Sequence, residues 1–315
     1  MPAEPGTSLN DTHNQPVLIV GTGAMACLFA ARLSAVGAQV IMLGTWPVGL
    51  QALRHNGVRL VEANGSQSAY PVSVCNDSRA CGEIHNALVL VKSWQTQHAA
   101  QQLAACLAQD GLALSLQNGI GNRETLSDAL GAHRVALGVT TQGATLLEPG
   151  QVRPGGEGVI SLSAHPRQAA LAKWLRAAGF IVENYPDATA LLWGKLVINA
   201  AINPLTALLN VPNRGVLERP SARALLIATA REAAAVAVAQ GISLPYPDPV
   251  VAAETIARRT ADNRSSMLQD VQRNAPTEID AICGAIVQAG ERTGVPTPIN
   301  RTLWYLVRAL VERNG

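Results

Sequence analysis

The chain has 315 residues, of which 48% are hydrophobic and 15% are charged, and its formal net charge is +2. A single hydrophobic core stops growing near ~250–300 residues, so this length predicts two domains, and the composition excludes wholesale disorder. The small net charge and an aromatic content of 3% argue against a nucleic-acid partner, which needs a basic surface and stacking side chains.

The N-terminus, the apolar runs and the cysteines all indicate a soluble cytoplasmic protein. Residues 1–15 are polar and contain no apolar core, so we expect a disordered tail and not a signal peptide. No uninterrupted run approaches the roughly 20 apolar residues that span a bilayer, so no membrane partner is expected. The five cysteines form no CxxC pair and no zinc-ligand spacing with a histidine, so we expect no metal site and a reducing compartment.

The first half of the chain alternates short apolar runs with helical stretches, which is typical of a parallel sheet built from βαβ units. Val17–Val20 is predicted to be a buried strand, followed by a glycine turn and an Ala-rich helix to about Val36. The remaining predicted elements are strands at 39–43, 87–91, 112–116, 135–139 and 180–183, helices at 95–108 and 167–178, and a Gly-rich hairpin within 152–163.

The character of the sequence changes from Asp187, where long Ala/Leu/Val helical patterns begin and no convincing strand follows. Pro186 punctuates the chain at this point and marks the predicted boundary. We therefore predict a doubly wound α/β domain over residues 16–186 and an all-helical domain over residues 187–315. The Ala-rich helices are compatible with packing within one subunit or between the subunits of a homodimer, so the oligomeric state is left open.

A G-x-G-x-x-A motif lies between the first predicted strand and the first predicted helix. Gly21 permits the tight turn, Gly23 lets the backbone approach a pyrophosphate, and the small Ala26 permits close packing of helix on strand. The pyrophosphate is expected at the helix N-terminus, where free N–H groups and the helix dipole favour an anion. The predicted cofactor-binding residues of this motif are Gly21, Thr22, Gly23, Ala24, Met25 and Ala26.

The end of the second predicted strand distinguishes between nicotinamide cofactors, because NAD enzymes usually carry Asp or Glu there to bind the ribose diol. Here the strand ends in Met42–Trp46, and no carboxylate stands between positions 11 and 62. An acidic side chain would repel a 2′-phosphate, so its absence favours NADPH. Thr45, Arg54 and Arg59 are candidate phosphate contacts, although a single arginine is also typical of a solvated helix or loop.

The most informative stretch of the second half carries a row of polar residues. Lys195, Asn199 and Asn203 recur every four residues and therefore lie on one face of a predicted helix. The residues between them are mainly apolar, so we expect a helix packed on most sides, whose polar groups need partners. Pro204 is expected to kink or interrupt this helix. A solvated polar stripe is the alternative, and the row itself leaves both interpretations open.

Four further polar residues are singled out by their position. Pro276 predicts a new helix with Glu278 in its first turn, where a carboxylate that stabilises the helix dipole is the alternative interpretation. Ser266 is either a functional or a surface hydroxyl. Lys92 and Asn118 each follow a predicted strand, at the edge where the ligands of open α/β sheets gather. The two glycines that follow Asn118 suggest that the backbone comes close to a ligand there.

Taken together, these residues resemble the ketopantoate reductase (2-dehydropantoate 2-reductase) family, in the family's order along nearly the whole chain from about residue 16. The matching stretches are G-T-G-A-M-A at 21–26, V-K-S-W-Q at 91–95, Q-N-G-I-G at 117–121, W-G-K-L-V-I-N-A-A-I-N-P-L-T-A at 193–207, N-R-S-S-M-L-Q-D at 263–270 and T-E-I-D at 277–280. The resemblance implies an N-terminal Rossmann dinucleotide-binding domain and a helical C-terminal domain that carries substrate binding and catalysis.

The resemblance also implies a reaction and a role for each residue. NADPH is expected to deliver hydride to C2 of 2-dehydropantoate, which gives (R)-pantoate for pantothenate and coenzyme A synthesis. Lys195 is then the proton donor and Glu278 its catalytic partner. The implied substrate ligands are Asn118, Asn199, Asn203, Asn263 and Ser266, and the implied cofactor contacts outside the glycine motif are Thr45, Lys92 and Asn118.

The sequence departs from the family pattern at two places, and two alternatives stay open. Ala26 stands where many members have glycine, and Gly44-Thr45 stands where members often carry a basic residue, which puts the strength of NADP selectivity in doubt. One alternative is an NADPH-dependent reductase of a different branched 2-oxoacid. The other is a non-catalytic NADP-binding regulator, which would need neither Lys195 nor Glu278.

Overall fold

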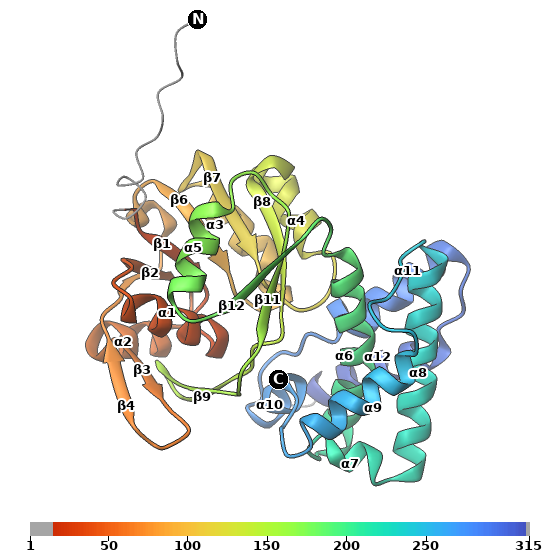
Figure 1. Ribbon diagram of the computed structural model, residues 1–315. Helices are drawn as coiled ribbons and strands as arrows, with labels where there is room; N and C mark the ends of the chain where they lie inside the picture. The colour runs from red at the N-terminus through yellow and green to blue at the C-terminus, as the bar shows by residue number, and fades with distance from the viewer. Residues whose placement is uncertain (1–14, 313–315) are drawn as a thin grey trace, which may run out of the picture. The chain divides into compact units, whose positions relative to one another are not determined.

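The computed structural model describes residues 15–312, which divide into two compact units (Figure 1). The first unit comprises the described residues up to Gln117 together with Asn122–Ala188, and the second comprises Asn118–Gly121 and the chain from Thr189 onward. Of the predicted N-terminal tail, residues 1–14 lie outside the described residues.

The first unit is built on an eight-stranded sheet with the strand order β12-β11-β8-β7-β6-β1-β2-β5. All neighbouring strands are parallel except β11, which runs antiparallel to β8. The strands are β1 (Val17–Val20), β2 (Val40–Leu43), β5 (Ser73–Cys75), β6 (Ile84–Val89), β7 (Leu107–Ser115), β8 (Val135–Thr140), β11 (Val159–Ser163) and β12 (Ile181–Tyr185). Together with the helices of the second unit, this sheet confirms the predicted α/β fold class.

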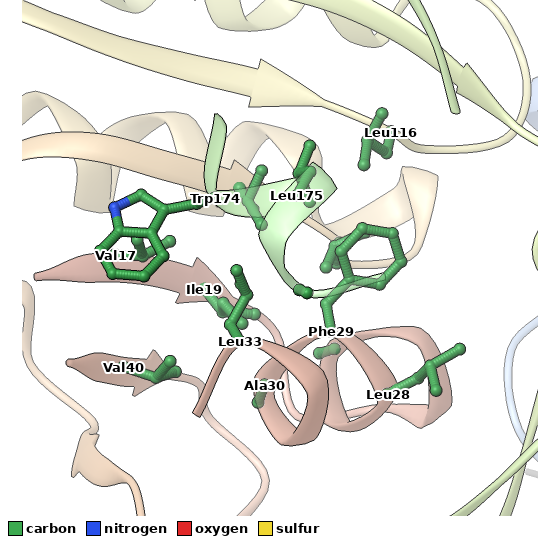
Figure 2. Packing of buried hydrophobic residues seen from close by; sticks show 14 of the residues in the cluster. Val17, Ile19, Leu28, Phe29, Ala30, Leu33, Val40, Leu116, Trp174 and Leu175 are labelled. Atoms are coloured by element: carbon green, nitrogen blue, oxygen red, sulfur yellow. The ribbon is translucent and has the colours of Figure 1, made fainter. Parts of the chain in front are cut away.

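Helices and 3₁₀ turns surround this sheet, so the apolar strands are buried as expected for parallel sheets. They are α1 (Ala24–Ala35), α2 (Pro47–Asn56), η2 (Ser78–Cys81), η3 (Ser93–Gln95), α3 (Thr96–Ala104), α4 (Asn122–Leu130), η4 (Ala132–Arg134) and α5 (Ala169–Ala177). Figure 2 shows Phe29 and Leu33 pointing from α1 toward Leu175 of α5. Phe29 also stacks on Phe180, with ring centroids 4.4 Å apart. This packing fixes α1, whose N-terminus carries the glycine motif.

A second sheet, which was not predicted, has the order β4-β3-β10-β9. Its strands are β3 (Val58–Val61), β4 (Gln67–Tyr70), β9 (Ala144–Glu148) and β10 (Gln151–Pro154). The hairpin predicted within 152–163 is wrong, because β10 pairs backward with β9 and β11 joins the large sheet. The Gly-rich segment after β10 therefore connects two sheets. Strands β3 and β4 were missed because they are short and carry several polar residues.

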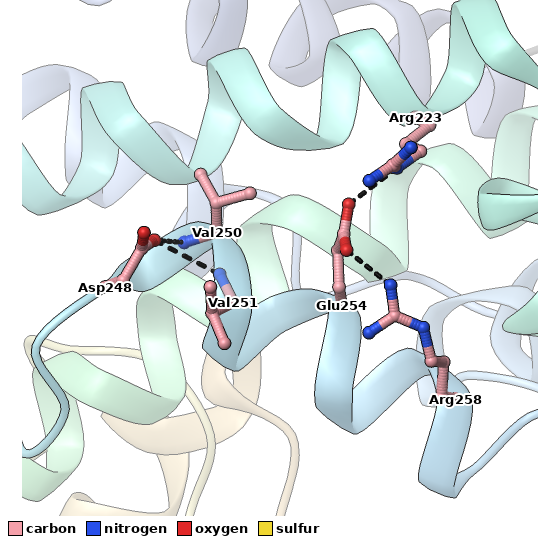
Figure 3. A network of polar contacts seen from close by, with 6 residues as sticks. All are labelled: Arg223, Asp248, Val250, Val251, Glu254 and Arg258. Carbon is pink, nitrogen blue, oxygen red and sulfur yellow. Dashed lines mark hydrogen bonds and ion pairs between the residues drawn. The ribbon is translucent and has the colours of Figure 1, made fainter.

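The second unit contains only helices among the residues that the structure describes. They are α6 (Thr189–Leu209), α7 (Arg214–Leu217), α8 (Pro220–Ala239), α9 (Pro249–Arg259), α10 (Ser266–Gln272), the π-helical turn η5 (Asp280–Gly284), α11 (Ala285–Thr293) and α12 (Pro298–Glu312). Polar contacts fix their ends and crossings. In Figure 3, Asp248 accepts two backbone N–H bonds at the start of α9, and Glu254 bridges Arg223 of α8 and Arg258 at 2.6 and 2.5 Å.

Helix α6 is long and apolar enough, by length and composition only, to cross a membrane, although Lys195, Asn199 and Asn203 interrupt its apolar residues. However, 67% of its most apolar 18-residue window is buried inside the structure. The core helix of a globular unit has the same composition, and α6 occupies that place. Pro204 does not interrupt it, contrary to one of the two predicted outcomes, since the helix continues to Leu209. Close packing on both sides of Pro204 holds the last turns in place.

Candidate active site

The glycine motif of the first unit forms a tight turn between β1 and α1. Gly21 has φ +130, and a Cβ at this position would lie 3.2 Å from the backbone carbonyl group of Leu90 on the neighbouring chain segment. An L side chain is therefore disfavoured by both conformation and space. The buried Ala26 lies in the first turn of α1 and faces the core.

The N-terminus of α1 is open to a ligand. Gly23 is exposed, and a Cβ built there meets no described atom within 4 Å; Ala24 and Met25 are half-exposed. The first turn of this helix contains no acidic residue, so nothing in it opposes the partial positive charge of the N–H groups. The turn therefore fits a dinucleotide pyrophosphate.

The end of β2 lies directly beside this turn. The Gly21 N–H donates to the Leu43 carbonyl at 2.8 Å, and a Cβ on Gly44 would lie 2.7 Å from the Thr22 side chain. Thr45 is exposed. Arg59 lies on β3 in the second sheet, where its guanidinium pairs with Glu148 at 3.2 Å. Arg54 is an exposed residue near the C-terminus of α2.

A buried network of amides and hydroxyls holds the loop that carries Lys92. The Gln117 side-chain amide donates to the Val91 carbonyl at 3.1 Å and to the Thr96 hydroxyl at 2.8 Å. Thr96 in turn donates to Asn122 at 2.8 Å. These bonds tie the ends of β6 and β7 together, so Lys92 stands on a fixed backbone at the carboxyl edge of the parallel sheet.

In the second unit, α6 carries the polar row predicted from the sequence. Lys195 and Asn199 are half-buried, and Asn203 is buried. Gly194, immediately before the lysine, has no room for a side chain, since a Cβ would lie 2.6 Å from Pro245. The Tyr246 hydroxyl donates to the Gly194 carbonyl at 2.8 Å. The polar row therefore belongs to a packed helix and not to a solvated one.

Lys195, Glu278 and Asn118 form an electrostatic group within the second unit. Burial lowers the pKa of Lys195 from 10.5 to about 8, and the carboxylate of Glu278 opposes this shift. The Glu278 side chain is buried, and its Oε2 accepts a hydrogen bond from Asn118 Nδ2 at 3.1 Å. An amine with such a pKa releases its proton near neutral pH, which suits a general acid.

The chain segments that supply Glu278 and Asn118 differ from their predicted form. Glu278 lies in a turn and not in the first turn of a helix, because helical structure begins at Asp280. The Glu278 carbonyl accepts the Ile282 N–H at 3.1 Å. Gly119 has φ +81, and a Cβ there would lie 2.6 Å from the Ala281 carbonyl oxygen. The close approach at Gly119 is thus to the backbone of η5, and it brings Asn118 to Glu278.

Hydroxyl groups connect the far end of the polar row to α10. The Thr206 hydroxyl donates to the Asn203 carbonyl at 2.8 Å and lies 2.7 Å from Ser265 Oγ. Ser265 also accepts the Leu268 N–H and caps α10. Ser265 is therefore structural, and the half-buried Ser266 at the first position of α10 stands next to the cap.

Asn213 is a polar residue that the sequence analysis missed. It is 7% exposed, its Nδ2 donates to the Thr260 hydroxyl, and its Oδ1 has no hydrogen-bond partner among the described residues. Its backbone N–H donates to the carbonyl of Asn263, whose side chain is exposed. A buried carbonyl oxygen without a donor is costly, and because this atom is shielded from solvent the cost falls on the packing of the unit. Its only signal in the sequence was an asparagine after Pro212, which is equally typical of a turn.

Comparisons with known proteins match this chain along nearly its whole length. The model of the ketopantoate reductase PanE/ApbA family matches residues 17–167, and the model of the C-terminal part of the same family matches residues 187–311. A 2-dehydropantoate 2-reductase of Archaeoglobus fulgidus is 36% identical over 94% of this chain and 98% of its own length. One of Halobacterium salinarum is 32% identical over 95% and 99%.

Two solved structures are similar throughout. A PanE/ApbA family ketopantoate reductase of Ralstonia eutropha JMP134 has a TM-score of 0.89 and 34% identity, and covers 95% of this chain and 99% of its own. A ternary structure of D-mandelate dehydrogenase with NADH and anilino(oxo)acetate also has a TM-score of 0.89, at 25% identity and with the same coverage. One fold therefore carries enzymes named for two different substrates.

Proposed function

Because the chain belongs to the ketopantoate reductase PanE/ApbA family, an oxidoreductase family, we propose that it reduces 2-dehydropantoate to (R)-pantoate with NADPH. The observation that carries this proposal is the group formed by Lys195, Glu278 and Asn118. A lysine with a pKa of about 8 beside a buried carboxylate is suited to proton transfer and is not needed for cofactor binding alone. This argues against a purely regulatory NADP-binding protein. The product would enter pantothenate and coenzyme A synthesis.

Reduction of the ketone adds a hydride to C2 and a proton to the carbonyl oxygen. The reduced nicotinamide supplies the hydride when it is bound. Lys195 donates a hydrogen bond to the carbonyl oxygen, stabilises the negative charge that develops there, and transfers its proton as the C–O π bond breaks. The lysine is left neutral, and solvent restores its proton before the next turnover. Glu278 keeps the amine protonated at neutral pH by raising its pKa.

The remaining polar residues of the second unit are proposed to bind the substrate. Asn199, Asn203 and Ser266 are proposed to donate hydrogen bonds to the carboxylate and hydroxyl oxygens of the substrate. Asn263, whose side chain is exposed, is proposed as a further substrate ligand. Sites that pair a substrate hydroxyl reject analogues that lack it, since the protein group is then left unpaired.

The cofactor-binding residues are proposed to be the glycine motif, Thr45, Lys92 and Asn118. NADPH is preferred in this proposal because the end of β2 carries no carboxylate that would bind a ribose diol or repel a phosphate. NADH is the competing cofactor, since the similar D-mandelate dehydrogenase was solved with NADH. We also propose a cytoplasmic location, which the five free thiols support.

A second candidate substrate is favoured by the same structural neighbour. The 2-oxoacid that corresponds to mandelate carries an aromatic ring in place of the branched hydroxyl-bearing chain of 2-dehydropantoate. Because the matching family models and the similar curated relatives are named for ketopantoate, we rank the hydroxylated substrate first.

The test is oxidation of the cofactor at 340 nm by purified protein. 2-Dehydropantoate is compared with 2-oxoisovalerate and phenylglyoxylate, each with NADPH and with NADH. The proposal expects the highest kcat/KM for 2-dehydropantoate with NADPH. Lys195→Ala should abolish turnover and leave NADPH binding nearly unchanged. Preference for another oxoacid would reject the substrate, and equal loss of turnover and binding would make Lys195 structural.

A further inference from the structure

The segment after β2 places a large aromatic side chain at the surface. Trp46 is 39% exposed and is the residue before α2. A tryptophan that keeps much of its ring in water forgoes burial of apolar area, and its exposed π-face is suited to contact with a planar ligand. The mechanism proposed above does not use this residue.

The indole of Trp46 is seated by the helix that follows it. A Cβ built on Gly49 would lie 2.2 Å from Cε3 and 2.8 Å from Cζ3 of the indole. The six-membered ring therefore packs directly against the glycine backbone, at a distance that only glycine permits. The backbone is fixed as well, because the Leu50 N–H donates to the Trp46 carbonyl at 2.9 Å and Pro47 starts the helix. One side of the indole is held, and another side faces solvent.

This indole stands at the end of the strand next to the dinucleotide turn. The hydrogen bond from Gly21 to Leu43 and the contact between Thr22 and Gly44 join the turn to the end of β2, two or three residues before Trp46. In open α/β folds with this glycine turn, the pyrophosphate lies at the helix N-terminus and the adenosine ribose lies at the end of the second strand. The base attached to that ribose therefore falls within the neighbourhood of Trp46.

We propose that Trp46, seated on Gly49, is the surface on which the adenine base of the nicotinamide dinucleotide stacks. This inference rests on the proposed function only in requiring a dinucleotide cofactor. Adenine is planar and presents a π-face, which an indole binds irrespective of the 2′-substituent of the ribose. The end of β2 has neither the acidic nor the basic side chain that binds the ribose in other enzymes. Stacking of the adenine on Trp46 supplies affinity for the cofactor there.

The experiment separates the adenosine half of the cofactor from catalysis. Full-length protein is titrated calorimetrically with 2′,5′-ADP, which contains the base and the 2′-phosphate but no nicotinamide, and then with NADPH. Trp46→Ala should weaken 2′,5′-ADP binding by roughly ten- to a hundred-fold, the usual range for loss of base stacking. Trp46→Phe should restore most of the affinity. Quenching of tryptophan fluorescence by 2′,5′-ADP should be lost in Trp46→Ala.

A second variant moves the indole without removing it. Gly49→Ala places a methyl group where the ring lies, so it should weaken 2′,5′-ADP binding in the same direction while keeping a helical backbone that alanine favours. Far-UV circular dichroism and thermal unfolding confirm that each variant is folded.

The outcomes are distinct. Unchanged 2′,5′-ADP affinity in Trp46→Ala, with wild type binding normally, overturns the inference and leaves the proposed function standing. Loss of affinity in Trp94→Ala alone, whose 53% exposed indole follows β6, overturns it in favour of that residue. If the wild-type protein binds neither NADPH nor NADH, the proposed function fails and the inference falls with it.

Discussion

The titration of Lys195 gives the sharpest test of the chemistry. Burial lowers the pKa of Lys195 to about 8, although Glu278 raises it. A general acid acts only while it is protonated, so kcat/KM for ketone reduction should be level below pH 8 and fall about ten-fold per pH unit above it. From a pKa of about 8, the protonated fraction is about 90% at pH 7 and about 10% at pH 9.

Glu278→Gln is the informative perturbation. The variant keeps the shape of the side chain but removes the negative charge that raises the pKa of Lys195. A neighbouring charge shifts a pKa by about one unit or more. The fall of kcat/KM on the alkaline side of the pH profile (the alkaline limb) should therefore move from about pH 8 to about pH 7. At pH 8 the protonated fraction then falls from about one half to about one tenth, a five-fold loss added to any pH-independent effect.

The assay is the pH profile of kcat/KM between pH 6 and 10, followed at 340 nm. Asp280→Asn is the matched control, because this carboxylate lies two residues from Glu278 but is exposed and contacts Trp304 and Arg308. Its alkaline limb should stay near that of wild type. A wild-type limb near pH 10 would refute the desolvation argument. A limb that moves upward in Glu278→Gln would refute the charge argument.

Three further predictions concern stability. Lys195→Met should raise the unfolding temperature at pH 7, because it removes a desolvated charge that costs on the order of 1–3 kcal/mol. The pKa of Lys195 in the folded protein is lowered to about 8, so the wild-type protein regains this stability as the pH rises from 8 to about 10.5. Calorimetry at pH 10 should therefore show little difference in unfolding temperature between variant and wild type. Gly119→Ala should lower the free energy of unfolding by about 1–3 kcal/mol in denaturant titration, because φ is +81 and the methyl group meets the Ala281 carbonyl. The control Gly121→Ala should lower it less, because a Cβ there has no described atom within 4 Å. Glu254→Gln should lower the unfolding temperature at pH 7, because the hydrogen bond from Arg223 stabilises the ionised Glu254 and lowers its pKa. This stabilisation is lost when Glu254 is protonated, so the difference in unfolding temperature between variant and wild type should shrink below about pH 4.

The sequence predicted the parts of the fold in which local pattern and final structure agree. The apolar run Val17–Val20, the glycine turn and the helix after it were all predicted, because a buried parallel strand is apolar on both faces. The second sheet was missed, since β3 and β4 satisfy their backbone groups by pairing with each other and with β10, and pairing between distant strands leaves no local signal. The misplaced hairpin has the same cause.

The candidate site was predicted residue by residue but not as a geometry. The spacing of Lys195, Asn199 and Asn203 identified one helix face from local periodicity. The bond between Asn118 and Glu278 joins positions 160 residues apart, and nothing in either local sequence indicates it. Asn213 was missed because its significance lies in an unpaired buried oxygen, a property of the packed structure. The helix predicted near Glu278 begins two residues later than expected, at Asp280, because proline after a polar segment is equally typical of a turn.

The membrane-like composition of α6 and the lowered pKa of Lys195 have one physical origin. A helix packed on most sides needs apolar residues around its circumference, and this composition satisfies the length and hydropathy criteria for a membrane span. The same apolar packing removes water from the lysine and disfavours its charged form. A more polar α6 would give a lysine closer to its ordinary pKa, which would hold its proton too tightly to donate it at neutral pH. The apolar helix therefore sets the pKa of the proposed proton donor, and the buried carboxylate of Glu278 limits how far the helix lowers it.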